Sequence, residues 1–359
     1  MATPLTTPLH AEHVALGGRM VEFAGYDLPV QYKSIIAESL AVRNGAGMFD
    51  VSHMARLTFR GGGVLGFLEH ITVNDVAALA DDHGQYSMLP NAHGGVVDDI
   101  IVYRISQDVY RMVVNAANHQ KDLAHIASLL PSDVEMSDQT AETAMIAVQG
   151  PGAADAVYSL TDQRAALEGL PFFGTATVEV AGVTAFAARS GYTGEDGFEI
   201  ICGASEAPAL WKALHQAGVE PCGLGSRDVL RVEAGLPLYG HELDDDTSPI
   251  AAGLGWVVSK SKPFLGSEKI NSDRDHGTPR KLQGVRLDGR RFPTPGMAVS
   301  VEGRVVGEVT SGVYSPLLGC GITFAFIDAE IPLKTPCTVD IRGSQEPGAI
   351  VSKRFFKRA

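Results

Sequence analysis

Apolar residues dominate positions 86–90 and 96–103, and a turn-forming segment with Gly94 and Gly95 separates them. Apolar runs on both sides of such a turn predict a β-hairpin. A further strand pattern covers positions 109–115. We therefore expect an antiparallel meander in this part of the chain, followed by a helix.

Helical patterns alternate with strand-like ones before residue 261. The predicted helices cover positions 33–44, 63–70, 118–130, 205–218 and 227–234. Small polar residues that favour the N-cap position stand at four of these starts, namely Ser34, Asn118, Ser205 and Ser226. Gly218 and Gly235 are expected to end the last two helices, because glycine adopts the left-handed conformation found there.

The pattern changes beyond residue 280, where short strand-like segments are separated by Gly and Pro. The predicted strands cover positions 285–287, 297–301, 304–310, 322–327, 338–341 and 349–355. Such a series favours a small β-barrel or a sandwich. The polar segment 261–280 is expected to be a boundary region, and the chain as a whole is predicted to be an α+β protein of two or three domains.

Composition narrows the functional classes. The formal net charge of −13 argues against a nucleic-acid surface. The four cysteines lie far apart without a C-x-x-C pair, which is typical of a reducing cytosol and not of a zinc ribbon. No secretory or transit signal and no transmembrane run is recognised. We expect a cytoplasmic protein without a metal, a membrane or a nucleic acid as partner.

Basic residues gather at the end of the chain, where Lys353, Arg354, Lys357 and Arg358 alternate with aromatic side chains. A solvated tail is the simpler interpretation. A basic rim that meets an anionic ligand or an acidic partner is the alternative.

Two acids, Asp98 and Asp99, interrupt the second strand of the predicted hairpin. Aspartate is depleted in strand interiors, and a carboxylate without a partner is costly in an apolar core. Alternation places Asp99 on one face with Ile101 and Tyr103, whereas Asp98 shares the other face with Arg104. Asp99 is therefore the better candidate for a carboxylate that acts on a ligand. Two solvated acids at the start of a strand are the alternative.

Residues 190–199 form a glycine-rich loop that runs into a strand. Tyr192 is expected to project from the loop, and Glu199 stands alone among hydrophobic residues of the strand. A buried carboxylate can accept two hydrogen bonds at once from adjacent N–H groups of a ligand. A pterin has such an edge.

Other polar clusters are interpreted as structural. The acidic segment 241–246 has the character of a cation site, but a solvated acidic loop is favoured because its spacing matches no EF-hand. Residues 49–54 hold Asp50, Ser52 and His53 close together, yet neighbours on a strand point to opposite faces, so a structural turn is favoured over a triad. The segment 223–225 lacks the third glycine of a dinucleotide motif and is expected to be a tight turn.

Longer stretches of the sequence are similar to a known family. They are spread from end to end and include "MVEFAGYDLPVQY", "AVRNGAGMFDVSHM", "YSMLPNAHGGVVDDIIVYR", "SGYTGEDGFEI" and "GLGSRDVLRVEAGLPLYGHELDDDTSP". With them the chain resembles the glycine cleavage system T-protein family, the tetrahydrofolate-dependent aminomethyltransferases.

The resemblance implies a three-domain cloverleaf around a central folate cavity. Two interleaved α+β domains with antiparallel sheets would cover 1–52 with 140–225 and 53–139 with 226–275, and a C-terminal β-barrel domain would cover 276–359. It also implies transfer of a one-carbon unit from the S-aminomethyl-dihydrolipoyl arm of the lipoylated H-protein to tetrahydrofolate. The products would be 5,10-methylenetetrahydrofolate, ammonia and the dihydrolipoyl H-protein.

The resemblance also assigns roles to single residues. The catalytic acid of the family maps onto Asp99. The folate contacts map onto Tyr86, Ile101, Tyr103, Asn115, Tyr192, Glu199, Arg227 and Lys357.

The chain departs from the family pattern at a few positions. An acidic residue of some relatives is Thr184 here, and a common tryptophan is Tyr26. Lys357 replaces an arginine that meets the folate tail, and lysine lacks the bidentate fork of a guanidinium.

Two further functions stay open at this point. A folate-dependent N-, O- or S-demethylase would share the fold and the cavity, and only the donor would differ. A non-enzymatic folate-binding protein of iron–sulfur assembly is the other. Relatives of the second kind carry a cysteine in a lysine-glycine-cysteine loop, where this chain has Gly191, Tyr192 and Thr193.

Overall fold

The computed structural model describes residues 3–358 and divides into two compact units. Unit 1 comprises the chain up to Ile71 together with Asp75–Ser87 and Ile100–Arg227. Unit 2 comprises Thr72–Asn74, Met88–Asp99 and the chain from Asp228 onward. The division into three domains with the bounds given above stays a prediction.

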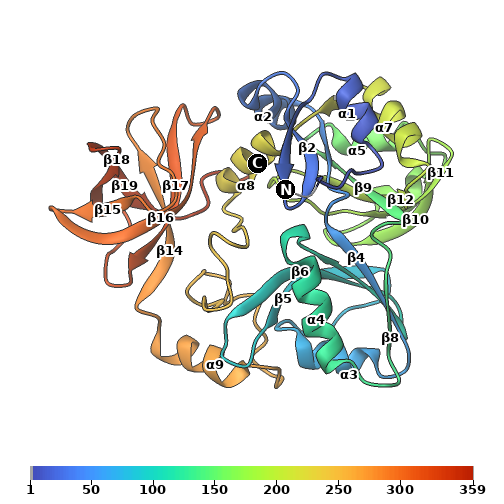
Figure 1. Ribbon diagram of the computed structural model, residues 1–359, viewed down its shortest axis with the longest axis horizontal. Coiled ribbons are helices and arrows are strands. Elements are labelled where there is room, and N and C mark those ends of the chain that lie inside the picture. The colour runs from blue at the N-terminus through green and yellow to red at the C-terminus, as the bar shows by residue number, and fades with distance from the viewer. Residues whose placement is uncertain (1–2, 359) are drawn as a thin grey trace. The chain divides into compact units, whose positions relative to one another are not determined.

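One of the two larger open sheets among residues 3–358 has six strands in the order β10-β11-β12-β9-β3-β13, and it belongs to unit 1. Its pairs are antiparallel except for the parallel pair of β13 and β3. The strands are β3 (Gly47–Asp50), β9 (Thr143–Gln149), β10 (Thr175–Val180), β11 (Val183–Ala188), β12 (Gly197–Gly203) and β13 (Glu220–Pro221). In Figure 1 the helices α1 (His10–Ala15), α5 (Ala153–Tyr158) and α7 (Ala207–Gln216) lie beside this sheet. The short helix α6 (Arg164–Glu168) follows α5 along the chain.

Helix α7 shows how the sequence pattern produces the core of this layer. Leu210, Trp211 and Leu214 are buried as their helical spacing predicts, and they pack with apolar residues of the sheet. The predicted cap was wrong by one residue, because Glu206 and not Ser205 occupies the N-cap. Pro208 is tolerated in the first turn of α7, because a backbone N–H at this position would have no intrahelical partner.

The predicted meander is confirmed in a five-stranded antiparallel sheet of order β5-β6-β7-β4-β8. Its strands are β4 (Ala55–Arg60), β5 (His83–Pro90), β6 (Val96–Ser106), β7 (Val109–Val114) and β8 (Glu135–Asp138). The boundary between the units falls within β5 and β6. Helix α3 (Val64–Ile71) packs against the sheet through Phe67, whose ring centroid lies 6.1 Å from that of Phe59 on β4.

Helix α4 (His119–Leu129) follows the meander, after a 3-10 turn at Ala116–Asn118. Asn118 occupies the N-cap as predicted, but its side chain makes no capping hydrogen bond, so the expected capping interaction was wrong. The 3-10 turn at Ala116–Asn118 leads directly into α4.

Helix α2 (Ile35–Asn44) begins as predicted, with Ser34 Oγ accepting a hydrogen bond from the Ala37 amide at 3.1 Å. It follows a hairpin of β1 (Arg19–Phe23) and β2 (Tyr26–Gln31). Glu38 of α2 then organises a distant helix start, because its Oε2 accepts from the Gly223 amide at 2.8 Å. The segment 223–225 is consequently the start of a helix, and the predicted tight turn was wrong.

That helix is α8 (Leu224–Ala234), and it begins earlier than the predicted position 227. Ser226 lies inside its first turn, where the hydroxyl donates to Gly223 O at 2.8 Å, so Ser226 is not the N-cap. Gly235 ends the helix as predicted, with φ of +83°. The cap was missed because Glu38 lies far away in the sequence.

Unit 2 contains a closed antiparallel barrel of order β14-β17-β16-β15-β18-β19, which confirms the predicted barrel. The strands are β14 (Arg280–Leu287), β15 (Ala298–Val301), β16 (Arg304–Ser315), β17 (Cys320–Asp328), β18 (Pro336–Ile341) and β19 (Ser344–Val351) (Figure 1). The polar segment before the barrel holds the helix α9 (Ser267–His276), which the sequence had indicated only as a boundary region. The α+β class with antiparallel sheets and a C-terminal barrel is therefore confirmed.

The acidic segment 241–246 is only partly a solvated loop. Glu242 is fully buried and accepts hydrogen bonds from Arg231 Nη1 at 3.0 Å and from Ser311 Oγ at 2.6 Å. Its carboxylate thus joins α8 to strand β16 of the barrel. The expectation of a solvated segment was wrong for Glu242, because its partners lie elsewhere in the sequence.

The C-terminal tail is likewise not a freely solvated segment. The backbone amide of Phe355 donates to Glu233 O at 3.0 Å, and its ring stacks on Phe324. Lys353 Nζ donates to Ala252 O at 2.8 Å, and burial lowers the pKa of this amine to about 8. Among residues 3–358, no helix is long and apolar enough to cross a membrane.

A buried polar network ties the N-terminal helix to β3. Asp50 Oδ2 lies 2.8 Å from His13 Nε2 and accepts from Thr7 Oγ1 at 2.6 Å, and Asp50 Oδ1 accepts from the Ser52 amide at 2.9 Å. Burial alone would raise the pKa of Asp50, but hydrogen bonds from His13, Ser52 and Thr7 outweigh it and leave the pKa below its ordinary value. Asp50 therefore pairs with a distant histidine and not with His53.

We expect Asp50→Asn to lower the free energy of unfolding by about 3 kcal/mol near neutral pH, since one partner of a buried pair is lost. A depressed pKa stabilises the fold above the unfolded-state value near 3.9, so the difference should vanish as the pH falls through the folded-state pKa. Urea unfolding at several pH values measures this. Asp27→Asn is the matched control, because Asp27 contacts His10 at the same 2.8 Å but is one-third exposed. A loss there as large as at Asp50 would contradict the role of burial.

Candidate functional site

The loop between β11 and β12 is held in place by buried polar side chains of unit 1. Arg43 Nη1 donates to Thr193 O at 2.8 Å and to Glu195 Oε1 at 2.9 Å. Gln149 Nε2 donates to Ser190 O at 2.9 Å, and its Oε1 accepts from Thr193 Oγ1 at 2.8 Å. These bonds hold the loop at Ser190, Thr193 and Glu195.

Glycine is required in this loop because the chain passes directly over Gln149. A Cβ at Gly191 would lie 1.8 Å from Gln149 Oε1. A Cβ at Gly197 would lie 2.0 Å from Val148 O, and its φ of +158° is rare for other residues. The glycines thus allow the close approach that presents Tyr192.

Glu199 lies on β12 directly after this loop and is 3% exposed. Ser190 Oγ donates to Glu199 Oε2 at 2.6 Å, and Tyr103 Oη lies 3.4 Å from Ser190 Oγ. Burial raises the pKa of Glu199, although the Ser190 hydrogen bond and the charge of Arg227 oppose the shift. The carboxyl keeps acceptor capacity in a dry environment, as predicted from its position among hydrophobic residues.

Tyr103 of β6 connects Glu199 to the second sheet. Its ring packs over Gly84 of β5, where a Cβ would lie 2.3 Å from the ring. It also meets Phe186 edge-on, with ring centroids 5.5 Å apart. Burial raises the pKa of Tyr103 above its ordinary value, so the phenol stays protonated and can donate.

Arg227 of α8 faces the tyrosine of the glycine loop. Its guanidinium carbon lies 4.8 Å from the centre of the Tyr192 ring, a cation–π distance, and Nη2 lies 4.0 Å from Met54 Sδ. Nη1 is buried and has no hydrogen-bond partner. Burial lowers the pKa of Arg227, although the charges of Glu199 and Tyr192 oppose the shift.

The segment before β4 is fixed by Arg56, which is 1% exposed. Arg56 Nη1 donates to Ser52 O at 2.8 Å and also to Met54 O, and Nη2 donates to Thr140 O at 2.6 Å. The residue between these two carbonyls is His53, which is 5% exposed. Burial lowers the pKa of His53 to about 4, and Nδ1 has no partner.

The structure therefore brings together four of the predicted site residues in unit 1, namely Tyr103, Tyr192, Glu199 and Arg227. Ser190 and Met54 were not among the site residues predicted from the sequence, and His53 was predicted to be structural. The signal that was available was the motif "FDVSHM", which holds two of these residues.

The other predicted site residues differ in exposure and are divided between the two units. Tyr86, Ile101 and Asn115 belong to unit 1 and are half-buried, and Lys357 of unit 2 is exposed. On β6, Asp98 is fully buried, whereas Asp99 is half-buried like Ile101. Asp99 and Ile101 thus share a face that is partly open.

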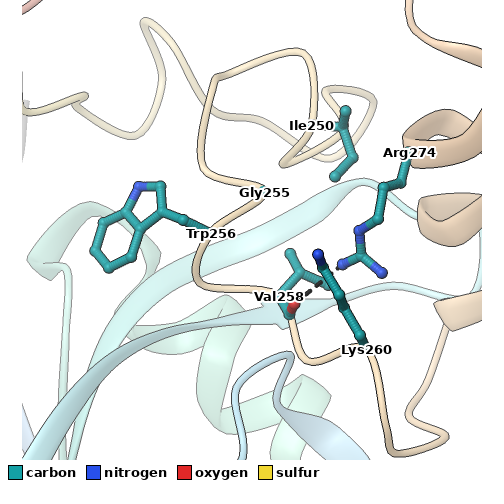
Figure 2. A pocket seen from close by; sticks show the side chains of 6 residues that line it. All are labelled: Ile250, Gly255, Trp256, Val258, Lys260 and Arg274. Atoms are coloured by element: carbon teal, nitrogen blue, oxygen red, sulfur yellow. Dashed lines mark hydrogen bonds between the residues drawn. The ribbon is translucent and has the colours of Figure 1, made fainter.

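A separate hollow of about 510 Å³ lies in unit 2. Figure 2 shows its lining, which comprises Ile250, Gly255, Trp256, Val258, Lys260 and Arg274. Arg274 Nη2 donates to Val258 O at 3.0 Å, and Trp256 is 77% exposed. The hollow contains no acid and none of the residues predicted from the sequence. In the described part of the chain, no group of three or more His, Cys, Asp or Glu side chains is placed to hold a metal ion.

Family models match most of the chain. The GCVT N-terminal domain matches residues 9–262, and the glycine cleavage T-protein C-terminal barrel domain matches residues 280–357.

Individual proteins agree with these matches. An aminomethyltransferase of Geobacillus kaustophilus is 44% identical, with 98% of this chain and 99% of the relative covered. An aminomethyltransferase of Thermus thermophilus is 47% identical, with 96% and 97% covered. The crystal structure of the glycine cleavage system aminomethyltransferase T from Bartonella henselae superposes with a TM-score of 0.91 at 31% identity, and 98% of each chain is covered.

These matches define the chain as a transferase. It belongs to the glycine cleavage T-protein family of aminomethyltransferases.

We expect Gly191→Ala to lower the free energy of unfolding by about 1–3 kcal/mol, because the added methyl group would overlap Gln149 and force the loop to shift. Thermal or urea unfolding measures the loss. Gly169→Ala is the matched control in unit 1, since nothing lies within 4 Å of a Cβ there. Equal stability of the two variants would show that the loop is not held as tightly as the Gln149 contacts indicate.

Proposed function

We propose that this aminomethyltransferase moves the one-carbon unit from the S-aminomethyl-dihydrolipoyl arm of the lipoylated H-protein to tetrahydrofolate. The methylene carbon loses its bonds to sulfur and to nitrogen and gains bonds to two folate nitrogens. The two hydrogens that these nitrogens release leave with the dihydrolipoyl sulfur and with ammonia. The products are 5,10-methylenetetrahydrofolate, ammonia and the dihydrolipoyl H-protein, and no metal takes part in this proposal.

The observation that carries the folate part of the proposal is the buried Glu199 beside Ser190 and Tyr103. A carboxylate in a dry place accepts hydrogen bonds strongly, and an unpaired one is costly, so a ligand with adjacent N–H donors would stabilise it. A pterin ring offers such an edge. The raised pKa of Glu199 supports this role, because donors from a ligand would favour the charged form.

Arg227 and Tyr192 supply the complementary features. The unpartnered Nη1 of Arg227 is a donor for an oxygen atom of the folate, and the half-buried Tyr192 ring offers an aromatic surface. Tyr86, Ile101, Tyr103 and Asn115 are proposed as further folate contacts. Lys357 is exposed, as a side chain that meets the carboxylates of a folate tail must be.

Asp99 is proposed as the catalytic acid. Loss of ammonia and attack by a folate nitrogen both pass through iminium-like positive charge, which a nearby carboxylate stabilises in a site with little water. Asp99 could also orient the attacking N–H group. Its half-buried position on the same face of β6 as Ile101 and Tyr103 supports the choice over the fully buried Asp98.

The three-domain arrangement around a folate cavity and the cytoplasmic location are parts of the same proposal. The four cysteines are free and buried, which agrees with a reducing compartment.

A donor assay tests the proposal as a whole. Purified protein with lipoylated, aminomethyl-loaded H-protein and tetrahydrofolate should release ammonia and form methylenetetrahydrofolate. The matched reaction replaces the carrier by sarcosine, a small N-methyl donor. Turnover of sarcosine without turnover of the carrier would favour a demethylase.

We expect Asp99→Asn to bind tetrahydrofolate nearly as well as the wild type. Its turnover should fall by about 100-fold or more, because a charge-stabilising group is lost. Calorimetry measures binding, and the carrier assay measures turnover. Asp98→Asn is the control, with unfolding monitored because Asp98 is fully buried. A correctly folded but inactive Asp98→Asn, together with a fully active Asp99→Asn, would reverse the assignment.

Glu199→Gln is expected to raise the Kd for tetrahydrofolate about tenfold or more, since a charge-assisted acceptor is replaced by a neutral amide. Turnover at saturating folate should change much less. Glu179→Gln, at an exposed position of β10, is the control. A variant at position 199 with normal binding and slow turnover would remove Glu199 from the anchoring role.

A further inference from the structure

Two buried polar atoms of neighbouring side chains in unit 1 have no hydrogen-bond partner among residues 3–358. One is Nδ1 of His53 and the other is Nη1 of Arg227. Two observations place the side chains of His53 and Arg227 in the same neighbourhood. The charge of Arg227 contributes to the lowered pKa of His53, and Arg227 contacts Met54, the residue after His53. Neither atom has a hydrogen-bond partner in the part of the chain that the structure describes.

Unsatisfied buried polar atoms are uncommon, since each loses its hydrogen bonds to water without gaining a replacement. The segment that carries His53 cannot move to avoid this cost, because Arg56 holds the carbonyls of Ser52 and Met54 on both sides of it. The imidazole is also fixed by edge-on contact with the Phe23 ring, whose centroid lies 5.7 Å away. The arrangement is that of a site whose polar atoms are completed by a bound group.

We propose that His53 is a further substrate-binding residue, which donates a hydrogen bond from Nδ1 to the same oxygen-bearing group of the folate that Arg227 binds. This inference rests on the proposed function, because it names the ligand of that site. It adds a residue that the sequence analysis had interpreted as part of a structural turn.

The chemistry of the neighbours defines this role. Arg227 can only donate hydrogen bonds, so the bound group must place an acceptor oxygen beside the Arg227 guanidinium. The tautomer of His53 with its proton on Nδ1 adds a second donor for that oxygen. Burial keeps the imidazole neutral at physiological pH, so His53 adds the donor without adding a second charge beside the guanidinium.

Substitutions that differ in the position of their polar atom test the proposal. The amide nitrogen of asparagine lies near the place of Nδ1, whereas that of glutamine lies near the place of Nε2. Loss of one hydrogen bond of about 1.4 kcal/mol corresponds to a tenfold change in affinity. His53→Leu and His53→Gln should therefore raise the Kd for tetrahydrofolate about tenfold, and His53→Asn should stay within about threefold of the wild type.

The control is His119→Gln, because His119 is a histidine of unit 1 that is partly buried and has Asp138 as a partner at 2.7 Å. It should leave the Kd unchanged. Thermal unfolding of each variant separates a binding defect from a folding defect. The ¹⁵N chemical shift of His53 Nδ1 gives a second readout on the wild-type protein, and it should change on addition of tetrahydrofolate to the value of a hydrogen-bonded N–H.

Two outcomes would overturn the inference while the proposed function stands. One is a folded His53→Leu variant with wild-type affinity, and the other is a Nδ1 signal that does not respond to saturating tetrahydrofolate. A wild-type protein that does not bind tetrahydrofolate at all would instead overturn the proposed function and this inference with it.

Discussion

The geometry of the site depends on the hydrogen bonds of the Arg56 guanidinium. This guanidinium lies at the start of β4 and is bound by backbone carbonyls of Ser52, Met54, Thr140 and Thr143 and by the Thr143 hydroxyl. These groups come from the segment before β4 and from the start of β9, so one side chain joins strands of both sheets. Its burial lowers the pKa of Arg56 to about 10, which is still high enough for a full positive charge at neutral pH. Its hydrogen bonds hold the carbonyls on either side of His53.

Unit 1 repeats the same principle at the glycine loop. Arg43 binds a carbonyl and a carboxylate of the loop, and Gln149 binds it at two further points. Buried polar groups that are fully hydrogen-bonded specify one conformation, whereas unsatisfied ones mark places that a ligand completes. Nη1 of Arg227 and Nδ1 of His53 belong to the second kind. Glu199 accepts one hydrogen bond from Ser190 and keeps further acceptor capacity.

Most of the fold could be predicted because it depends on local patterns. The meander, the barrel strands and the buried face of α7 follow from spacing alone. Two errors occurred where a partner lies far away in sequence. Glu38 caps α8 from another helix, and Arg231 with Ser311 buries Glu242. Glu199 and Tyr192 were predicted because a lone acid and a glycine loop are visible locally. The role proposed for His53 could not be predicted locally, because it depends on Arg227, more than 170 positions later.

The choice of carbonyl oxygens as partners for Arg56 has a consequence for how the molecule responds to its surroundings. A carbonyl dipole takes up no proton in moderate acid, and it carries no net charge that dissolved ions could screen. The contacts of Arg56 should therefore outlast those that depend on a carboxylate, such as the attachment of the N-terminal helix through Asp50. Acid would therefore release helix α1 first and leave the Arg56 contacts between β4 and β9 intact.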